Sequence, residues 1–184
     1  RLSIFDTCGT GGDGKNTLNI STAVAILSSA CGVKIAKHGN KSVSSKSGSS
    51  DVLSELGVNI FASKKVVQNC LKRNGLCFLM APLYHSAMKN VANARANLQI
   101  KTIFNILGPL INPANAKKQL IGVYSKDWMD RIAECIKKLK MKKVWVVNGT
   151  DGLDEITTTG ITNVIEVIGN KVRNFEINPK ELGI

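Results

Sequence analysis

Short apolar runs alternate with helix-like stretches along the whole of this 184-residue sequence. Four of the runs have the length of buried strands and are flanked by turn or polar residues: residues 33–36, 76–80, 120–124 and 144–147. Residues 3–5 can end an earlier strand. Because strands that alternate with helices form a parallel sheet covered on both faces, the sequence predicts the α/β class.

Helix signals lie between these strands. Residues 21–31 are apolar on nearly every side and stop at Gly32, which predicts a buried helix with a glycine at its carboxyl end. A second helix is expected over residues 49–56. Residues 127–139 have the pattern of an amphipathic surface helix, with lysines in the last turn.

The carboxyl-terminal part of the sequence predicts a different kind of strand pairing. Residues 163–177 contain two alternating runs joined by Gly169 and Asn170, which is a two-residue hairpin signal. The segment "PLINPAN" at 109–115 holds two prolines and predicts an irregular crossing. The expected architecture is a mainly parallel sheet flanked by helices, with a C-terminal antiparallel hairpin.

The charge and the cysteine content limit the binding partners and the cellular location that we expect for this protein. The 25 basic and 13 acidic residues give a net charge of +12, which predicts attraction to an anion, either nucleic acid or a phosphorylated metabolite. Five cysteines with no CxxC pair favour reduced thiols and a cytoplasmic protein. No apolar run is long enough to cross a bilayer, so no membrane partner is expected, and the start at Arg1 is typical of a cut, processed or excerpted chain.

The glycine-rich segment "CGTGGDG" at 8–14 lies between a predicted strand and a predicted helix. Glycine permits positive φ and close backbone approach, so successive N–H groups can point into one concavity and hold phosphate oxygens. The start of the following helix adds its positive end. The spacing is that of neither a P-loop nor a GxGxxG motif, and a flexible turn is the alternative interpretation.

Three further polar segments follow or precede predicted elements: "NIST" at 19–22, "KHGN" at 37–40 and "SSKSGSSD" at 44–51. Simple helix capping by Asn19, Ser21 or Thr22, and by Ser49 or Ser50, is one interpretation, and solvated loops are another. We expect "KHGN" to be the loop after the strand at 33–36. Because a parallel sheet brings such loops to one edge, the set also predicts a ligand site.

Asp154 and Glu155 form the only adjacent acidic pair in this basic chain and follow the predicted strand at 144–147. Two carboxylates opposite a phosphate loop suit Mg²⁺, which commonly bridges a few carboxylates to substrate phosphates, whereas an exposed acidic turn is the alternative. No serine or histidine lies in a nucleophile or metal motif, and we interpret Cys8 as incidental.

The segments GTGGD, NIST, KHGN, SSKSGSSDVLSELG, YHSAMKNVANARANL, IFNILGPLINPA and DGLDE, in this order, resemble the anthranilate phosphoribosyltransferase family. The resemblance implies a nucleoside phosphorylase/phosphoribosyltransferase-like large domain over residues 1–184, with a hinge to a helical domain over 85–112. Helices that family members carry before the glycine loop and after the end of this sequence are expected to be missing. The implied reaction transfers phosphoribosyl from phosphoribosyl pyrophosphate to the anthranilate amine, with Mg²⁺, in a homodimer.

The resemblance also implies a set of site residues. The phosphoribosyl pyrophosphate side would include Gly9, Thr10, Gly11, Gly12, Asp13, Thr17, Asn19, Ser21, Thr22, Lys37 and Ser49. The anthranilate side would include His38, Gly39, Asn40, His85, Arg95, Gly108 and Pro109. Ser21, Asp154 and Glu155 would hold the metal, and Lys37 and Arg95 would position the transition state without any covalent nucleophile.

Two alternatives remain at the level of sequence. Pyrimidine-nucleoside phosphorylases share the glycine loop, but their lysine-serine phosphate motif is not found here. A nucleic-acid-binding relative of the same fold would suit the net charge of +12. Nucleic acid is the less expected partner, because the lysines are dispersed and few aromatic residues are present to stack on bases.

Overall fold

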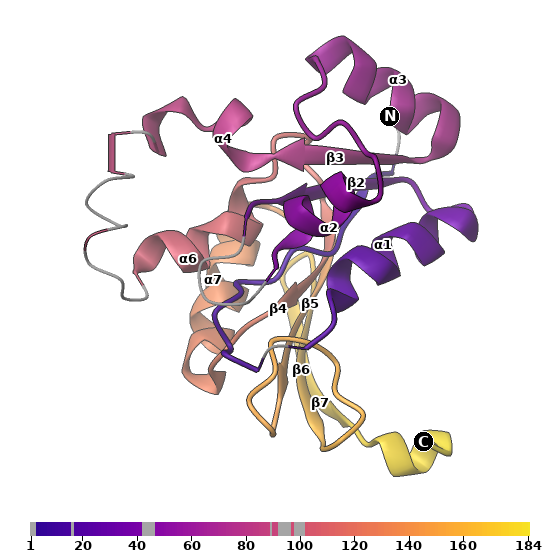
Figure 1. Ribbon diagram of the computed structural model, residues 1–184. Coiled ribbons are helices and arrows are strands. Elements are labelled where there is room, and N and C mark those ends of the chain that lie inside the picture. The colour runs from indigo at the N-terminus through magenta and orange to yellow at the C-terminus, as the bar shows by residue number, and fades with distance from the viewer. Residues whose placement is uncertain (1–2, 16, 42–46, 89, 92–96, 98–101) are drawn as a thin grey trace.

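The computed structural model describes residues 3–15, 17–41, 47–88, 90–91, 97 and 102–184 (Figure 1). Within these residues the strands form one seven-stranded sheet in the order β3-β2-β1-β4-β5-β6-β7. The strands are β1 (Phe5–Asp6), β2 (Ile35–Gly39), β3 (Leu76–Met80), β4 (Lys118–Gly122), β5 (Lys143–Gly149), β6 (Thr162–Ile168) and β7 (Lys171–Ile177). Strands β1 to β5 pair in parallel, whereas β6 and β7 add an antiparallel hairpin, so the predicted fold class is confirmed.

The helices are short and connect the parallel strands. The α-helices are α1 (Ile20–Ala30), α2 (Ser49–Glu55), α3 (Lys64–Asn74), α4 (Ala81–Tyr84), α6 (Ile103–Leu107) and α7 (Met129–Lys138). Single 3₁₀ turns are η1 (Ser86–Met88), η2 (Gly108–Ile111), η3 (Lys126–Trp128) and η4 (Pro179–Leu182). None of the helices in the described residues is both long and apolar enough to span a bilayer.

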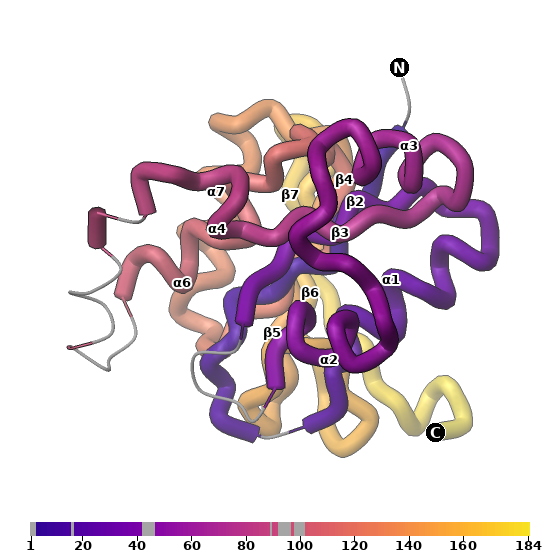
Figure 2. The backbone as a smooth tube through the Cα atoms, turned by 45° about the horizontal axis from the view of Figure 1, so that its top comes forward, coloured from indigo at the N-terminus to yellow at the C-terminus, as the bar shows by residue number. Residues whose placement is uncertain are grey.

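Helices cover the two faces of the sheet in pairs. Ala36 of β2 packs with Val67 and Leu71 of α3, whereas the next residue, Lys37, reaches Ser21 of α1 on the opposite face. The strand register places the α7 contacts on the same face as those of α3. Figure 2 shows α1 and α7 on opposite sides of the strands.

Three clusters of buried apolar side chains make up the core. The largest joins α7 to β4, β5 and β6, and a second joins α3 to β2 and β3. The third places Leu53 of α2 and Ile60 against Phe78 and Met80 of β3. Burial of these side chains against the sheet stabilises the connections that carry the loops at its carboxyl edge.

Several predicted elements occur where the sequence placed them. The runs at 76–80 and 144–147 are β3 and the centre of β5, and the hairpin turns at Gly169, whose φ is +58°. The segment at 109–115 begins within η2 and continues without regular pairing, as expected. The surface helix at 127–139 is present as η3 followed by α7.

Other boundaries were predicted wrongly. The strand expected at 33–36 is β2, which continues to Gly39 because Lys37, His38 and Gly39 pair with β3. The strand expected at 120–124 begins earlier, at Lys118, where it pairs with β1 and β5. Helix α3 was not predicted from the sequence.

Helix α1 is not the buried helix that its apolar composition predicts. Only Thr22 and Ala25 are buried along it, whereas Leu27 is 66% exposed. The inward face of α1 rests on β2 and β3, and its outward face meets no other described element closely enough to bury it. The cap of α2 is also different, because Gly48 precedes the helix and its N–H donates to Asp51 Oδ2 at 2.7 Å, in place of a cap by Ser49 or Ser50.

The five cysteines are free thiols, as the odd number and spacing predicted. The expected hinge at 85–112 stays a prediction, because residues 89, 92–96 and 98–101 lie outside the described part of the chain.

Candidate functional site

The polar loops gather where the order of the strands reverses. From β1, one connection leads through α1 to β2, and β4 lies on the other side of β1 in the sheet. In open α/β sheets the crevice at the carboxyl ends of such strands is the usual ligand site. The glycine loop follows β1 at this point, and Gly122 ends β4 beside it, since the N–H of Thr10 donates to the Gly122 carbonyl at 2.9 Å.

Three residues of the glycine loop have a backbone conformation that favours glycine. Gly11, Gly12 and Gly14 have φ values of +64°, +81° and +70°, which glycine adopts without strain. The N–H of Gly11 donates to Asp154 Oδ2 at 2.7 Å, so an amide of the loop already points at an anionic oxygen. The loop and the acidic pair, 143 residues apart in sequence, are therefore in direct contact.

Close packing explains two of the glycines at this contact. A Cβ added to Gly9 would lie 2.9 Å from Asp154 Oδ2. A Cβ added to Gly122 would lie only 1.5 Å from the backbone oxygen of Asp154. The loop that carries the acids can lie across the end of β4 only because residue 122 has no side chain.

The start of α1 links the glycine loop to α2. Asn19 precedes α1 but its side chain does not cap it; its Oδ1 accepts hydrogen bonds from the hydroxyls of Thr22 and Ser49, the latter at 3.3 Å. The interpretation that the Asn19 side chain simply caps the helix is therefore wrong. Ser21 lies inside the first turn, where its carbonyl accepts from Thr7 Oγ1 at 2.8 Å.

Lys37 connects these loops from beneath. Its ammonium is buried and donates to Ser21 Oγ at 3.0 Å, with the Thr7 carbonyl and hydroxyl at 3.4 and 3.5 Å. The backbone N–H of Ser21 and the charge of Lys37 lie close enough to Glu155 to favour its ionised form. Lys37, Ser21 and Glu155 thus lie close together, and Asp154 is the neighbour of Glu155 in the chain.

Burial and neighbouring negative charges disfavour the ionised forms of both acids. Burial, followed by the charge of Asp154, raises the pKa of Glu155 to about 8, while Lys37 opposes this shift. Burial, followed by the charge of Asp13, raises the pKa of Asp154. Nearby negative charges and desolvation disfavour ionised carboxylates, and a bound cation would reverse both effects.

The oxygen atoms of Asp154, Glu155 and Ser21 suit a hard divalent cation that would bind a phosphate group as well. No group of three or more His, Cys, Asp or Glu side chains within the described ranges has the arrangement of a metal site. Asp154, Glu155 and the Ser21 hydroxyl provide oxygen ligands only, which leaves further positions of an ion to water or phosphate. Mg²⁺ commonly binds in this way, through one or two carboxylates and substrate phosphates.

The histidines lie on the other face of β2. The segment "KHGN" was expected to be a loop, but Lys37 and His38 are consecutive residues of β2. Their side chains therefore point to opposite faces of the sheet. His38 is 2% exposed; its Nδ1 lies 3.1 Å from the Gly108 carbonyl oxygen, and its Nε2 lies 3.1 Å from Nε2 of His85. The structure therefore brings together His38, His85 and Gly108, three of the residues expected on the anthranilate side.

A buried pair that sequence reasoning missed joins the two parts of the site. Asp6 is fully buried, and its Oδ2 accepts from Asn112 Nδ2 at 2.7 Å, while its Oδ1 accepts from the N–H groups of Thr7 and His38 at 2.8 and 3.1 Å. Burial raises the pKa of Asp6, and the charge of Lys37 opposes this. The position of Asp6 at the end of an apolar strand was a sequence signal for a buried acid. No local pattern identified Asn112 as its partner.

The remaining predicted residues are less tightly placed. Gly39 lies against Phe78 and Ser49, where an added Cβ would be 2.8 Å from the phenyl ring. Asn40 Oδ1 accepts from the Lys41 N–H at 2.8 Å, and Pro109 is buried in η2. Thr17 is exposed in the loop before α1, and Arg95 lies outside the described residues.

Cys8 lies in surroundings that disfavour its thiolate form. It is buried beside the glycine loop, and burial together with the charge of Asp6 raises the pKa of its thiol well above the usual range. A thiolate is the reactive form of cysteine, so the interpretation of Cys8 as incidental agrees with the structure.

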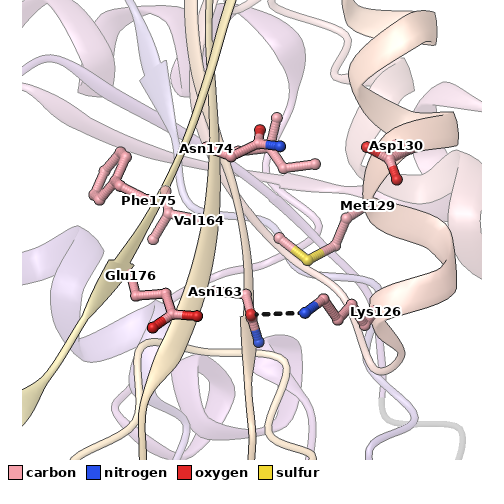
Figure 3. Close-up of a pocket in the computed structure, with 9 residues that line it drawn as sticks. Lys126, Met129, Asp130, Asn163, Val164, Asn174, Phe175 and Glu176 are labelled. Atoms are coloured by element: carbon pink, nitrogen blue, oxygen red, sulfur yellow. Dashed lines mark hydrogen bonds between the residues drawn. The ribbon is translucent and has the colours of Figure 1, made fainter.

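A separate cavity lies between the start of α7 and the β6–β7 hairpin (Figure 3). It has a volume of about 360 Å³, and its lining includes Met129, Val164 and Phe175. Lys126 Nζ donates to Asn163 Oδ1 at 3.1 Å on its wall. None of the residues expected to bind substrate or metal lines it, so it is distinct from the site at the carboxyl edge.

Sequence comparison identifies close relatives of this chain. The anthranilate phosphoribosyltransferase of Clostridium kluyveri is 54% identical over 180 residues, which cover 98% of this chain and 54% of the relative. The enzyme of the same name from Brevibacillus brevis is 51% identical over 181 residues, covering 98% and 53% respectively. The chain thus spans about half the length of the curated relatives it matches.

Comparisons with solved structures and with a family model give the same result as the sequence comparison. The anthranilate phosphoribosyltransferase of Thermus thermophilus has a TM-score of 0.91 at 41% identity, with 100% of this chain and 54% of that chain covered. The enzyme of Saccharomyces cerevisiae in complex with PRPP and Mg has a TM-score of 0.89 at 38% identity, with 98% and 50% covered. Residues 1–184 match the description "Glycosyl transferase family, a/b domain". This chain therefore belongs to that glycosyl transferase family.

Proposed function

We propose that the protein acts as an anthranilate phosphoribosyltransferase in tryptophan biosynthesis. It would transfer phosphoribosyl from phosphoribosyl pyrophosphate to the amine of anthranilate and release pyrophosphate. The contact between Gly11 of the glycine loop and the half-buried Asp154, which precedes Glu155, is the observation that carries this proposal, because it joins an anion-binding amide to oxygen ligands for a cation. The similarity to relatives with this name supports the choice of substrates.

The residues around the loops bind and orient the diphosphate. Backbone N–H groups of the glycine loop and the hydroxyls of Thr10 and Ser49 would donate to its oxygens, and the Lys37 ammonium lies beneath Ser21 to balance their charge. Asp154, Glu155 and Ser21 would hold Mg²⁺, whose chemistry is to neutralise negative charge on the departing pyrophosphate. These groups favour the state in which the bond between ribose C1 and the diphosphate oxygen breaks.

The acceptor amine is positioned from the other face of β2. Its nitrogen would form the new bond to ribose C1 as the C1–O bond to the diphosphate breaks, and it would lose one N–H proton to the released pyrophosphate or to water, so no covalent nucleophile is needed. His38, His85, Gly108 and Pro109 would line this approach, and Arg95 would pair with the substrate carboxylate. Phosphorolysis of nucleosides and nucleic-acid binding are not favoured by the relatives.

Assembly and location are part of the same proposal. We expect a homodimer in the cytoplasm. The free cysteines and the soluble, anionic substrates are consistent with that location.

The acidic pair gives the direct test of the proposed function. We expect the combined change Asp154→Asn and Glu155→Gln to abolish Mg²⁺-dependent consumption of anthranilate and release of pyrophosphate, because the oxygen ligands lose their charge. Isothermal titration calorimetry with Mg²⁺ and phosphoribosyl pyrophosphate measures binding separately.

The matched control is the combined change Glu134→Gln and Glu181→Gln, which removes two exposed carboxylates from α7 and η4. The control should keep wild-type transfer and binding. Unchanged turnover of the Asp154→Asn/Glu155→Gln variant at low Mg²⁺ would refute the metal-binding role.

A further inference from the structure

His38 lies between two hydrogen-bonding partners on the face of β2 opposite to Lys37. The Gly108 carbonyl oxygen is 3.1 Å from its Nδ1, and Nε2 of His85 is 3.1 Å from its Nε2. The two rings are nearly perpendicular, at 77°, with centroids 5.1 Å apart. The three groups form a continuous chain from the backbone of η2 to the side chain that follows α4.

The chemistry of these atoms fixes where the protons lie. A carbonyl oxygen can only accept, so the proton of the neutral His38 ring is on Nδ1 and its Nε2 is an acceptor. The contact between the two Nε2 atoms then requires His85 to donate from Nε2. A neutral His85 is left with an unprotonated Nδ1, and no described residue donates to that atom.

The surroundings keep His38 neutral. Burial is the main reason that the pKa of its imidazole is lowered, and His85 and Lys37 add to the shift. Asp6 faces the backbone rather than the ring, since its Oδ1 accepts the His38 N–H at 3.1 Å. A carbonyl and a second imidazole are thus the groups that contact the ring nitrogens.

We propose that the Gly108 carbonyl and His38 are positioning groups that hold His85 in its Nε2-protonated tautomer, so that Nδ1 of His85 accepts a hydrogen bond from the amine of the acceptor substrate. This rests on the proposed function for the identity of that amine. An acceptor with no N–H or O–H donor at this position would leave the nitrogen unpaired, which selects for a primary or secondary amine over a tertiary amine.

Nuclear magnetic resonance of the imidazole nitrogens tests the tautomers directly. The sequence contains two histidines, so the ring ¹⁵N spectrum of the uniformly labelled protein holds two spin systems, and His85→Gln assigns them. At pH 7.5 and without ligand, we expect His38 to be protonated at Nδ1 and His85 at Nε2. A wild-type spectrum with His38 protonated at Nε2, or with His85 averaged between its tautomers, overturns the proposal by itself.

Two substitutions of His38 provide a matched pair. The Asn amide of His38→Asn can replace the Nδ1 donor toward Gly108 but does not reach His85, whereas the longer Gln of His38→Gln can present an oxygen near the former Nε2. We expect mixed His85 tautomers in His38→Asn and the Nε2-protonated form in His38→Gln. An unchanged His85 tautomer in a folded His38→Asn variant would contradict the relay.

Steady-state kinetics test whether the tautomer of His85 affects the binding of anthranilate. Loss of one oriented hydrogen bond corresponds to about a tenfold rise in the KM for anthranilate in His38→Asn, with the KM for phosphoribosyl pyrophosphate unchanged. The His38→Gln variant should stay within about threefold of wild type. Equal effects on both KM values would exclude a role toward the amine. Absence of any transfer by the wild-type protein would instead reject the proposed function, while the spectrum would still decide the tautomers.

Discussion

His38 makes the stability of the fold depend on pH in a defined direction. Burial, then His85, lowers the pKa of its imidazole to about 4, whereas an unfolded chain takes up the proton near pH 6.5. The neutral ring therefore contributes stability that is complete above pH 6.5 and is lost as the pH falls toward 4. We expect a loss on the order of 3 kcal/mol in the free energy of unfolding over this range.

Urea unfolding of the wild type and of His38→Gln between pH 7 and pH 4 isolates this contribution, because all carboxyl groups are common to both proteins. The wild type should lose more stability than the variant on acidification. Parallel pH profiles would show that His38 is not the group that stays neutral.

A single methyl group added at Gly122 should displace the loop that carries Asp154 and Glu155. In Gly122→Ala the new Cβ would lie 1.5 Å from the backbone oxygen of Asp154, so the loop must move. We expect at least a tenfold loss of affinity for Mg²⁺ and phosphoribosyl pyrophosphate by calorimetry, one decade being about 1.4 kcal/mol. Gly57→Ala is the control: φ is +81° there with no atom within 4 Å, so it should cost only about 1 kcal/mol of stability and leave the affinity unchanged.

At the scale of elements, one buried hydrogen-bond pair ties the crossing at 109–115 to the centre of the sheet. Asn112 Nδ2 donates both to Asp6 of β1 and to the Ala36 carbonyl of β2, at 2.7 and 2.8 Å. Removing either side chain leaves a buried polar group without its partner, which costs about 1–3 kcal/mol. A double-mutant cycle of Asp6→Ala and Asn112→Ala should give a coupling of at least about 1 kcal/mol in urea unfolding. Additive effects would mean that the two elements are held together by other contacts.

The same elements show what the sequence can and cannot predict. Apolar runs located most of the strands, and Gly169 with Asn170 located the hairpin, because these signals are local. The end of β2 was misjudged, since Lys37 and His38 are polar and only pairing with β3 makes them strand residues. Asp6 and Asn112 are 106 residues apart, so no local pattern could pair them. The burial of α1 likewise depends on which distant elements cover it.

At the scale of the whole molecule, the proposed ligand would add contacts between segments that, outside the sheet, are joined by only a few hydrogen bonds. The glycine loop, the start of α1, the end of β2 and the loop after β5 all reach the same edge. Gly11 donates to Asp154, Lys37 donates to Ser21, and Glu155 lies within the electrostatic reach of Lys37. Binding to the folded state alone stabilises it by about 2.7 kcal/mol at a ligand concentration of 100 Kd.

We therefore expect saturating phosphoribosyl pyrophosphate with Mg²⁺ to raise the Tm by about 5–10 °C, given the entropy of unfolding of a chain of this size. Differential scanning calorimetry with ligand, with Mg²⁺ alone and with ligand plus a chelator separates the contributions. In Asp154→Asn/Glu155→Gln the shift should largely disappear, because the two side chains that would hold the cation lose their charge, whereas Glu134→Gln/Glu181→Gln should show the full shift. An equal shift in both variants would place the ligand away from the acidic pair and would count against the site as a whole.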